Sequence, residues 1–230
     1  MKTSLYLFVL LIFLGSCNNN TGSGFTVEGK LNGAAGQTVF LNLLTENDFM
    51  TLDSAIVDEE GNFLLGGNIS GKEFFMLKLS ETNFLYLLID SLDHIFINAQ
   101  AGDLLMTAKI DSSDDSGLLL ELNRHNYRTR MRVDSLSMAY QRLQNSVNID
   151  SLRRAMDSIY TTIFFNEKKY ITGFIEKNSS SLAAYMALYQ KISPKYFIVD
   201  PMAHPEDLQY FKMIDSTLNN KYPESFHVKS

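Results

Sequence analysis

Apolar and polar residues alternate through the first half of the chain, and this alternation predicts β-strands. Between residues 25 and 110 the apolar side chains recur at every second position in about eight short runs, which places them on one face of a strand. The runs are 25–31, 39–43, 52–56, 63–65, 75–79, 85–89, 95–97 and 104–110. Short polar turns separate most of them, and strands joined in this way pair antiparallel. We therefore expect residues 25–112 to form an antiparallel β-sandwich or open barrel.

One turn can be assigned in more detail. Val57–Leu64 contains a run of acidic residues followed by Gly61 and Asn62, between two apolar segments. Glycine accepts the positive φ that a tight turn of this kind requires. We therefore predict a β-hairpin over Val57–Leu64.

The apolar spacing becomes helical after Gly117. Two successive stripes repeat every three or four residues, and Asn148 or Asp150 between them is a suitable helix N-cap. The first stripe is Leu119, Leu122, Val133, Leu136, Tyr140, Leu143 and Val147, and the second is Leu152, Met156, Ile159, Ile163, Tyr170 and Phe174. They predict two helices of about 30 residues each, paired as an antiparallel hairpin about 40 Å long.

Two shorter helices complete this half of the chain. The first is expected to begin at Ser180 or Ser181, and the second at Pro205, because these residue types favour the start of a helix. Residues 116–225 are therefore predicted to form a small helical bundle with a long helical hairpin. The predicted fold class of the whole chain is α+β.

The N-terminus has the three parts of an export signal. Lys2 gives the positive charge, residues 5–14 the apolar run, and residues 15 and 16 the small side chains before a cleavage site. The run has only about half of the roughly 20 residues that a membrane-spanning helix needs, so we expect residues 1–16 to be removed. Cys17, the single cysteine, follows directly, and this pattern resembles the lipobox of bacterial lipoproteins. The resemblance implies lipidation of Cys17; the alternative is an ordinary signal that happens to end near a cysteine.

The residues after Cys17 indicate how the chain is held. Residues 17–24 are small and polar, which is typical of a flexible tether. Attached acyl chains bind a membrane durably, since each buried methylene contributes about 0.8 kcal/mol. Asn18 and Asn19 lack the aspartate that would resemble an inner-membrane retention signal, so we expect the protein at the periplasmic face of an outer membrane.

Composition narrows the classes of function. The chain has 20 basic and 26 acidic residues, a formal net charge of −6, and an acidic chain is a poor nucleic-acid binder. With its one cysteine lipidated, the mature chain would have no thiol for a disulfide or for redox catalysis. We therefore expect neither a nucleic-acid partner nor redox chemistry within this chain.

Two segments look like ligand-binding loops but depart from them at a required position. Residues 66–72 match the start of a phosphate-binding loop, but Glu73 stands where Ser or Thr must hold Mg²⁺. Residues 111–117 have the oxygen-rich composition of a calcium loop, but the glycine comes one position late and the closing glutamate is missing. We expect a strand turn in the first case. In the second we expect a linker whose Asp115 or Ser116 caps the next helix.

The remaining candidate groups do not form a recognisable site. His94, His125, His204 and His227 lack metal-ligand spacing, and Glu121 is expected to pair with His125 on a helix surface. No nucleophile motif is present, although two carboxylates distant in sequence could still meet as a glycosidase pair. We predict no catalytic residue, no cofactor-binding residue and no metal ligand.

Four aromatic residues leave two alternatives open. Phe74, Phe84, Tyr86 and Phe96 lie near the phase opposite to the main apolar face of their strands. They either line a ligand groove or pack the second face of the sheet against the helices. The packing alternative is favoured.

Several segments resemble a known family. They are the lipobox, Phe25–Leu31, Val39–Leu41 and Leu52–Phe63, and they are similar to the N-terminal β domain, of unknown function, of lipoprotein thiol-disulfide oxidoreductases. In that family a helical segment and a thioredoxin-like domain of the alkyl hydroperoxide reductase and thiol-specific antioxidant class follow. The family's active site is a C-x-x-C motif in that last domain, and no residue of this sequence matches it.

The resemblance and the missing motif lead to two hypotheses. The first is a membrane-tethered, non-catalytic periplasmic lipoprotein that binds or positions an unknown protein partner, such as a periplasmic redox protein. The second is the accessory half of a thiol-disulfide oxidoreductase, active in cell redox homeostasis, whose catalytic domain lies beyond residue 230. A lipoprotein that binds a ligand on its aromatic β face is a third possibility.

Overall fold

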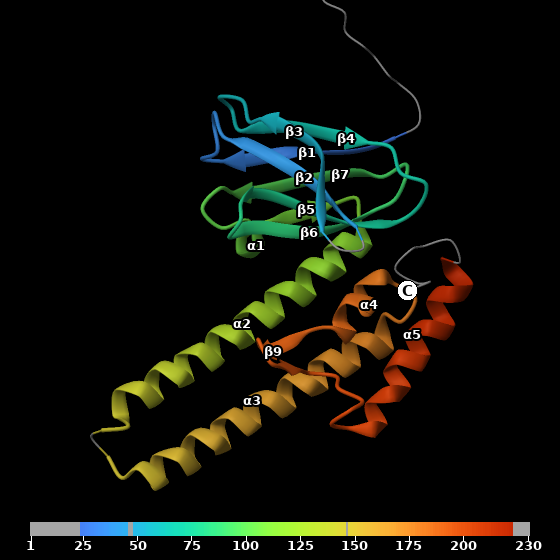
Figure 1. The fold of residues 1–230 in the computed structure, drawn as a ribbon. Helices are drawn as coiled ribbons and strands as arrows, with labels where there is room; N and C mark the ends of the chain where they lie inside the picture. Colours follow the sequence, from blue (N-terminus) through green and yellow to red (C-terminus); the bar gives the residue numbers. More distant parts are fainter. Residues whose placement is uncertain (1–23, 46–47, 146, 223–230) are drawn as a thin grey trace, which may run out of the picture.

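Two four-stranded sheets precede a group of helices (Figure 1). The structure is a computed structural model that describes residues 24–45, 48–145 and 147–222. The sandwich strands are β1 (Phe25–Asn32), β2 (Thr38–Leu44), β3 (Phe49–Ile56), β4 (Asn62–Gly67), β5 (Glu73–Ser80), β6 (Asn83–Ile89), β7 (His94–Gln100) and β8 (Lys109–Asp111). Sheet A has the strand order β4-β1-β7-β8, and sheet B has the order β3-β2-β5-β6. The predicted α+β class and β-sandwich are confirmed.

The alternation of the sequence produces the core between the two sheets. In β7 every second residue is buried, and β1 follows the same pattern. Side chains such as Val27 and Ile97 of sheet A meet Leu41, Leu77 and Leu87 of sheet B in one apolar cluster. Burial of this face gives each strand a fixed register, because a shift by one residue would turn its apolar side chains outward.

The pairing of β1 with β7 differs from the expected arrangement. These two strands are parallel, with Gly29 opposite Ile97. The prediction of antiparallel pairing is wrong for them, and it is right for the other neighbours in the two sheets. The physical reason is that β2 to β6 lie between β1 and β7 in the sequence. These strands form the long crossover that a parallel pair needs.

Residues 104–110 do not form the single strand that their alternation predicted. The carboxylate of Asp103 accepts a hydrogen bond from the amide of Met106 and caps a one-turn helix, α1 (Leu104–Thr107). Only β8 continues sheet A after this turn. A local cap thus overrides the strand pattern.

The prediction of a hairpin at Val57–Leu64 is wrong as well. β3 before it pairs with β2 in sheet B, and β4 after it pairs with β1 in sheet A. Gly61 has a φ of 89°, as expected for the turn. The turn therefore joins the two sheets instead of two paired strands.

The helical part contains the predicted long hairpin. Helices α2 (Asp114–Leu143) and α3 (Ile149–Lys177) lie side by side and extend away from the sandwich (Figure 1). The remaining elements are α4 (Leu182–Leu188), β9 (Lys191–Ser193), β10 (Tyr196–Phe197), the 3-10 helix η1 (Pro205–Asp207) and α5 (Leu208–Lys221). Within the described part of the chain, no helix is both long and apolar enough to cross a membrane.

The helix starts largely follow the predicted capping residues. Asn148 caps α3, Ser181 caps α4, and Pro205 begins the turn that leads into α5. Helix α2 starts earlier than expected, because its N-cap is Ser113 instead of Asp115 or Ser116. Asp115 and Ser116 are consequently free to join the helix to its neighbours.

A second apolar core joins the helices to sheet B. Phe74 of β5 and Leu88 of β6 pack with Leu119 and Leu122 of α2 in this cluster. The buried hydroxyl of Ser116 accepts a hydrogen bond from the amide of Leu88 at 3.0 Å and donates one to its carbonyl at 2.8 Å. The start of α2 thereby satisfies both backbone groups of Leu88 at the edge of β6. The domain limits proposed from the sequence, 25–112 and 116–225, stay predictions.

Candidate functional site

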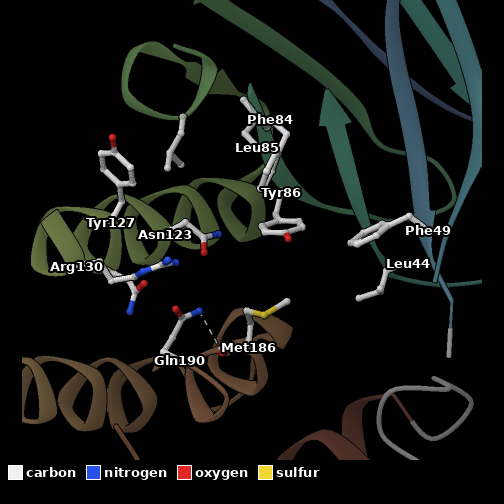
Figure 2. Close-up of a pocket in the computed structure, with 12 residues that line it drawn as sticks. Leu44, Phe49, Phe84, Leu85, Tyr86, Asn123, Tyr127, Arg130, Met186 and Gln190 are labelled. Atoms are coloured by element: carbon white, nitrogen blue, oxygen red, sulfur yellow. Dashed lines mark hydrogen bonds between the residues drawn. The ribbon is translucent and has the colours of Figure 1, made fainter. Parts of the chain in front are cut away.

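A cleft of about 470 Å³ lies between the outer face of sheet B and the helices (Figure 2). It is lined by Leu44, Phe49, Phe84, Leu85, Tyr86, Leu105, Asn123, Asn126, Tyr127, Arg130, Met186 and Gln190. Ligand pockets commonly enclose about 300–1,000 Å³ and combine apolar walls with a few polar groups. The volume and the lining of this cleft both fit that description.

Aromatic side chains form one end of the cleft. The ring of Tyr86 lies 5.3 Å from that of Phe84 in an edge-to-face arrangement and 6.2 Å from that of Phe49 in a stacked one. Leu44 and Met186 lie on the same side (Figure 2). Burial raises the pKa of the Tyr86 phenol further above neutral pH, where a tyrosine hydroxyl already keeps its proton. This end offers a flat apolar surface with one hydroxyl.

Polar side chains form the other end. Asn123 and Arg130 are seven residues apart on α2 and therefore share one face of the helix. Their side chains and that of Gln190 point toward the same space (Figure 2). Gln190 donates a hydrogen bond from Nε2 to the carbonyl of Met186 at 3.4 Å. Amide and guanidinium groups thus face the aromatic end across the cleft.

Asn123 is the unusual member of this group. Its Nδ2 is buried and has no hydrogen-bond partner among the described residues. An unsatisfied buried donor costs about 1–3 kcal/mol. Asn126, one turn further along α2, differs because its Nδ2 donates to the carbonyl of Lys191 at 3.3 Å. The cleft lining therefore contains a donor for which the described residues supply no acceptor.

We expect the substitution Asn123→Leu to stabilise the protein. It removes an unpaired donor and places an apolar side chain of similar size beside the aromatic wall. The free energy of unfolding should rise by about 1 kcal/mol. Urea denaturation followed by circular dichroism would measure the change.

Asn126→Leu is the matched control for this experiment. It removes the partner of the Lys191 carbonyl and should lower the free energy of unfolding by about 1 kcal/mol. If both substitutions destabilise the protein to a similar degree, Asn123 has a structural partner and its donor is not available to a ligand.

A second polar cluster lies between α2 and α3. Oε2 of the buried Glu167 accepts a hydrogen bond from Oγ1 of Thr129 at 2.6 Å and lies 2.8 Å from Nε2 of His125. The ring of His125 stacks on that of Tyr170 with 3.4 Å between centroids. Burial, followed by the charge of Glu121, raises the pKa of Tyr170 to about 12. These contacts hold the two long helices together.

This cluster corrects one prediction about the histidines. His125 does not pair with Glu121 on the surface of α2, since its partner is Glu167 of α3. Glu121 instead accepts a hydrogen bond from the hydroxyl of Tyr170 at 3.4 Å. The partner of His125 is therefore a residue of another helix, distant in sequence, and not its neighbour on α2.

The two loop-like segments meet in the structure. Lys72, from residues 66–72, forms an ion pair with Asp115, from residues 111–117. The other oxygen of Asp115 accepts a hydrogen bond from the hydroxyl of Ser181 at 2.6 Å. The side chains of Lys72 and Asp115 are only 16% and 18% exposed. The two segments thus join the sandwich to α2 and to the start of α4.

The charges of this pair support one another. Burial alone would lower the pKa of Lys72 and raise that of Asp115, because it disfavours the charged form of each. Their mutual hydrogen bond and charge outweigh burial, with help from Ser181 at Asp115. The pKa of Lys72 is raised and that of Asp115 is lowered as a result.

The other predicted residues have different outcomes. Of the four aromatic residues, Phe84 and Tyr86 line the cleft, Phe74 packs in the second core, and Phe96 is 42% exposed. Both alternatives, groove and packing, are therefore found at different positions. Cys17, the proposed lipidation site, lies outside the described residues. Among the residues that are described, no group of three or more His, Cys, Asp or Glu side chains is arranged to hold a metal ion.

The sequence pattern did not identify Asn123 and Arg130. The apolar stripe on α2 predicted the core positions Leu119 and Leu122, whereas a neighbouring face of the same helix lines the cleft. Asn123, Asn126, Tyr127 and Arg130 have the i, i+3, i+4, i+7 spacing of one helix face. A polar face with this spacing was the available signal.

Comparison with known proteins places the sheet side of the cleft in a recognised domain. Residues 25–119 match the model of a domain of unknown function, DUF4369. No curated protein and no solved structure matches the chain. The matched segment contains the sandwich and the first turns of α2, and therefore Phe49, Phe84 and Tyr86. Asn123, Arg130 and the other lining residues of α2 and α4 lie outside it.

Proposed function

We propose that this chain is a non-catalytic binding module of the cell envelope, tethered to a membrane through lipid on Cys17. Its binding site is the cleft between sheet B and the helices. The module holds a ligand or a partner group there and positions it relative to the membrane surface. On this proposal the surface is the periplasmic face of an outer membrane.

The observation that carries this proposal is the composition of the cleft. An aromatic wall around Tyr86 faces the amide of Asn123 and the guanidinium of Arg130. These groups suit recognition, because the rings supply apolar contact and the amide and guanidinium supply oriented hydrogen-bond donors. The unpaired Nδ2 of Asn123 supports a bound state in which it has an acceptor.

The proposed anchor rests on the sequence around Cys17. The apolar run before it and the polar tether after it match the order of a lipoprotein signal. Both cores and the cleft consist of residues after Gly24.

A second candidate function follows from the resemblance to thiol-disulfide oxidoreductases. The segments that carry the resemblance, Phe25–Leu31, Val39–Leu41 and Leu52–Phe63, all fall within the matched residues 25–119. On this alternative the module is the accessory half of such an enzyme in cell redox homeostasis. A thioredoxin-like domain beyond residue 230 would then supply the chemistry.

The intact mass of the protein from the membrane fraction of its own cells tests the anchor and separates the two candidates. We expect acyl groups on Cys17, and a total mass equal to that of residues 17–230 plus these groups would support the non-catalytic module. A chain produced without residues 1–16 is the control and should carry no acyl mass. An unmodified Cys17 in the native protein would contradict lipid anchoring. A mass larger by a whole domain would support the oxidoreductase alternative.

A further inference from the structure

The cleft has a polarity that points to one class of ligand. Its aromatic end is apolar apart from the hydroxyl of Tyr86, and its opposite end contains the donors of Asn123 and Arg130 beside the amide of Gln190. Donors that converge on one end need a group with several acceptor atoms. The apolar end needs a group that can lie against aromatic rings.

Arg130 is the charged group of this end. None of the described carboxylates forms an ion pair with it, while Arg124 of the same helix is bound to the carbonyls of Leu105 and Ala108. The guanidinium of Arg130 points toward the space between Asn123 and Gln190 (Figure 2). A guanidinium binds carboxylate, sulfonate or phosphate oxygens with two parallel hydrogen bonds.

We infer that the cleft binds a small organic anion with a flat apolar body. Its anionic group lies against Arg130 and accepts a hydrogen bond from Nδ2 of Asn123. Its body lies against Tyr86 and Phe49. The inference rests on the proposed function, because it names the class of ligand for the same cleft.

The size of the cleft supports a small molecule as the occupant. A cleft of about 470 Å³ with walls from sheet B and from helices α1, α2 and α4 has room for one compact body. The overall charge of −6 repels anions in general, so a local guanidinium is needed to favour one. The ligand is therefore selected by the charge of the cleft instead of that of the whole protein.

A pair of fluorescent probes with the same aromatic body tests the inference. Anilinonaphthalene sulfonate carries an anion, and phenylnaphthylamine is the same body without it. The protein is produced from residue 18 onward without lipid, so that the probes have no membrane to enter, and every described contact lies in the retained chain. We expect the sulfonate to bind about tenfold more tightly than the uncharged probe, the effect of one charged hydrogen-bonded pair.

Substitutions in the cleft assign this difference to Arg130. Arg130→Gln should weaken binding of the sulfonate about tenfold and leave the uncharged probe unchanged. Arg130→Lys should retain part of the preference because it keeps the charge. Arg132→Gln is the matched control, since Arg132 is an exposed arginine of α2 outside the cleft lining, and it should change neither probe.

Tyr86→Leu distinguishes failure of the inference from failure of the proposed function. It should weaken both probes if the cleft is the binding site. Equal binding of the two probes, weakened by Tyr86→Leu but unaffected by Arg130→Gln, would overturn the choice of an anion and leave cleft binding intact. Absence of binding, or binding that is unaffected by Tyr86→Leu, would overturn the proposed function itself.

Discussion

Gly29→Ala should prevent stable folding of the sandwich. Gly29 lies in β1, inside sheet A, between β4 and β7. A Cβ atom at this position would lie 1.8 Å from the carbonyl oxygen of Ile97, which belongs to the neighbouring backbone. The φ of Gly29 is 155°. Relief of the clash requires separation of the two parallel strands, so we expect a loss of more than about 4 kcal/mol of stability.

Gly173→Ala is the matched control for this substitution. Gly173 lies within α3, and a Cβ atom there would meet nothing within 4 Å. Alanine favours a helix over glycine by about 1 kcal/mol, so this variant should be more stable than the original protein. Urea denaturation followed by circular dichroism would measure both variants. If Gly29→Ala unfolded at the same urea midpoint as the original protein, this result would contradict the close parallel pairing of β1 with β7.

The fold was predictable where local pattern and burial agree. The strict alternation in β7 and the three- and four-residue spacing in α3 both identified their elements, because each pattern has one way to bury its apolar side chains. The N-caps of α3 and α4 were predictable for a similar reason. Asn148 and Ser181 bind backbone amides only two or three residues away.

The errors arose where a distant partner decides the structure. β1 and β7 are adjacent in sheet A although about 60 residues separate them, and no local pattern carries that information. The turn at Gly61 was recognised, but the sheet to which each flanking strand belongs depends on β1 and β2. His125 likewise found its partner, Glu167, in another helix.

The candidate site shows the same division. Phe84 and Tyr86 were recognisable from their phase within a strand, since side chains opposite to the core face need some other cover. Which of the four aromatic residues line a cleft depends on where the helices dock. The helices bury Phe74 and leave Phe84 and Tyr86 at the cleft. The donors of Asn123 and Arg130 form part of a candidate site only because the fold places them opposite that aromatic wall.

The loop-like segments at residues 66–72 and 111–117 lead to the last prediction. Neither has a complete ligand-binding pattern, and the structure joins them through Lys72 and Asp115. Removing one partner leaves the other charge largely buried, so Asp115→Asn and Lys72→Met should each lower the free energy of unfolding by about 2–3 kcal/mol. Urea denaturation near neutral pH would measure both losses.

The double variant Lys72→Met/Asp115→Asn separates the pair from its surroundings. It buries no uncompensated charge, so its loss should be smaller than the sum of the single losses by about 1–2 kcal/mol. Glu81→Gln is the control, because Glu81 is 84% exposed in its contact with Lys78 and its loss should stay within about 0.5 kcal/mol. Additive losses for Lys72 and Asp115 would show that the pair does not couple the two parts of the protein.

The pH dependence of this coupling follows from the two pKa shifts. The pKa of Asp115 is lowered by folding, so its stabilisation is present above the unfolded value of about 4 and is lost as the pH falls through the folded value. The pKa of Lys72 is raised, so its stabilisation is present below about 10.4 and is lost as the pH rises through the folded value. The stability difference between the original protein and the double variant should therefore be constant between about pH 5 and 9. Below about pH 4 the difference should shrink, because the stabilisation from Asp115 is lost there. A difference that varies across the neutral range would assign the coupling to a group other than this ion pair.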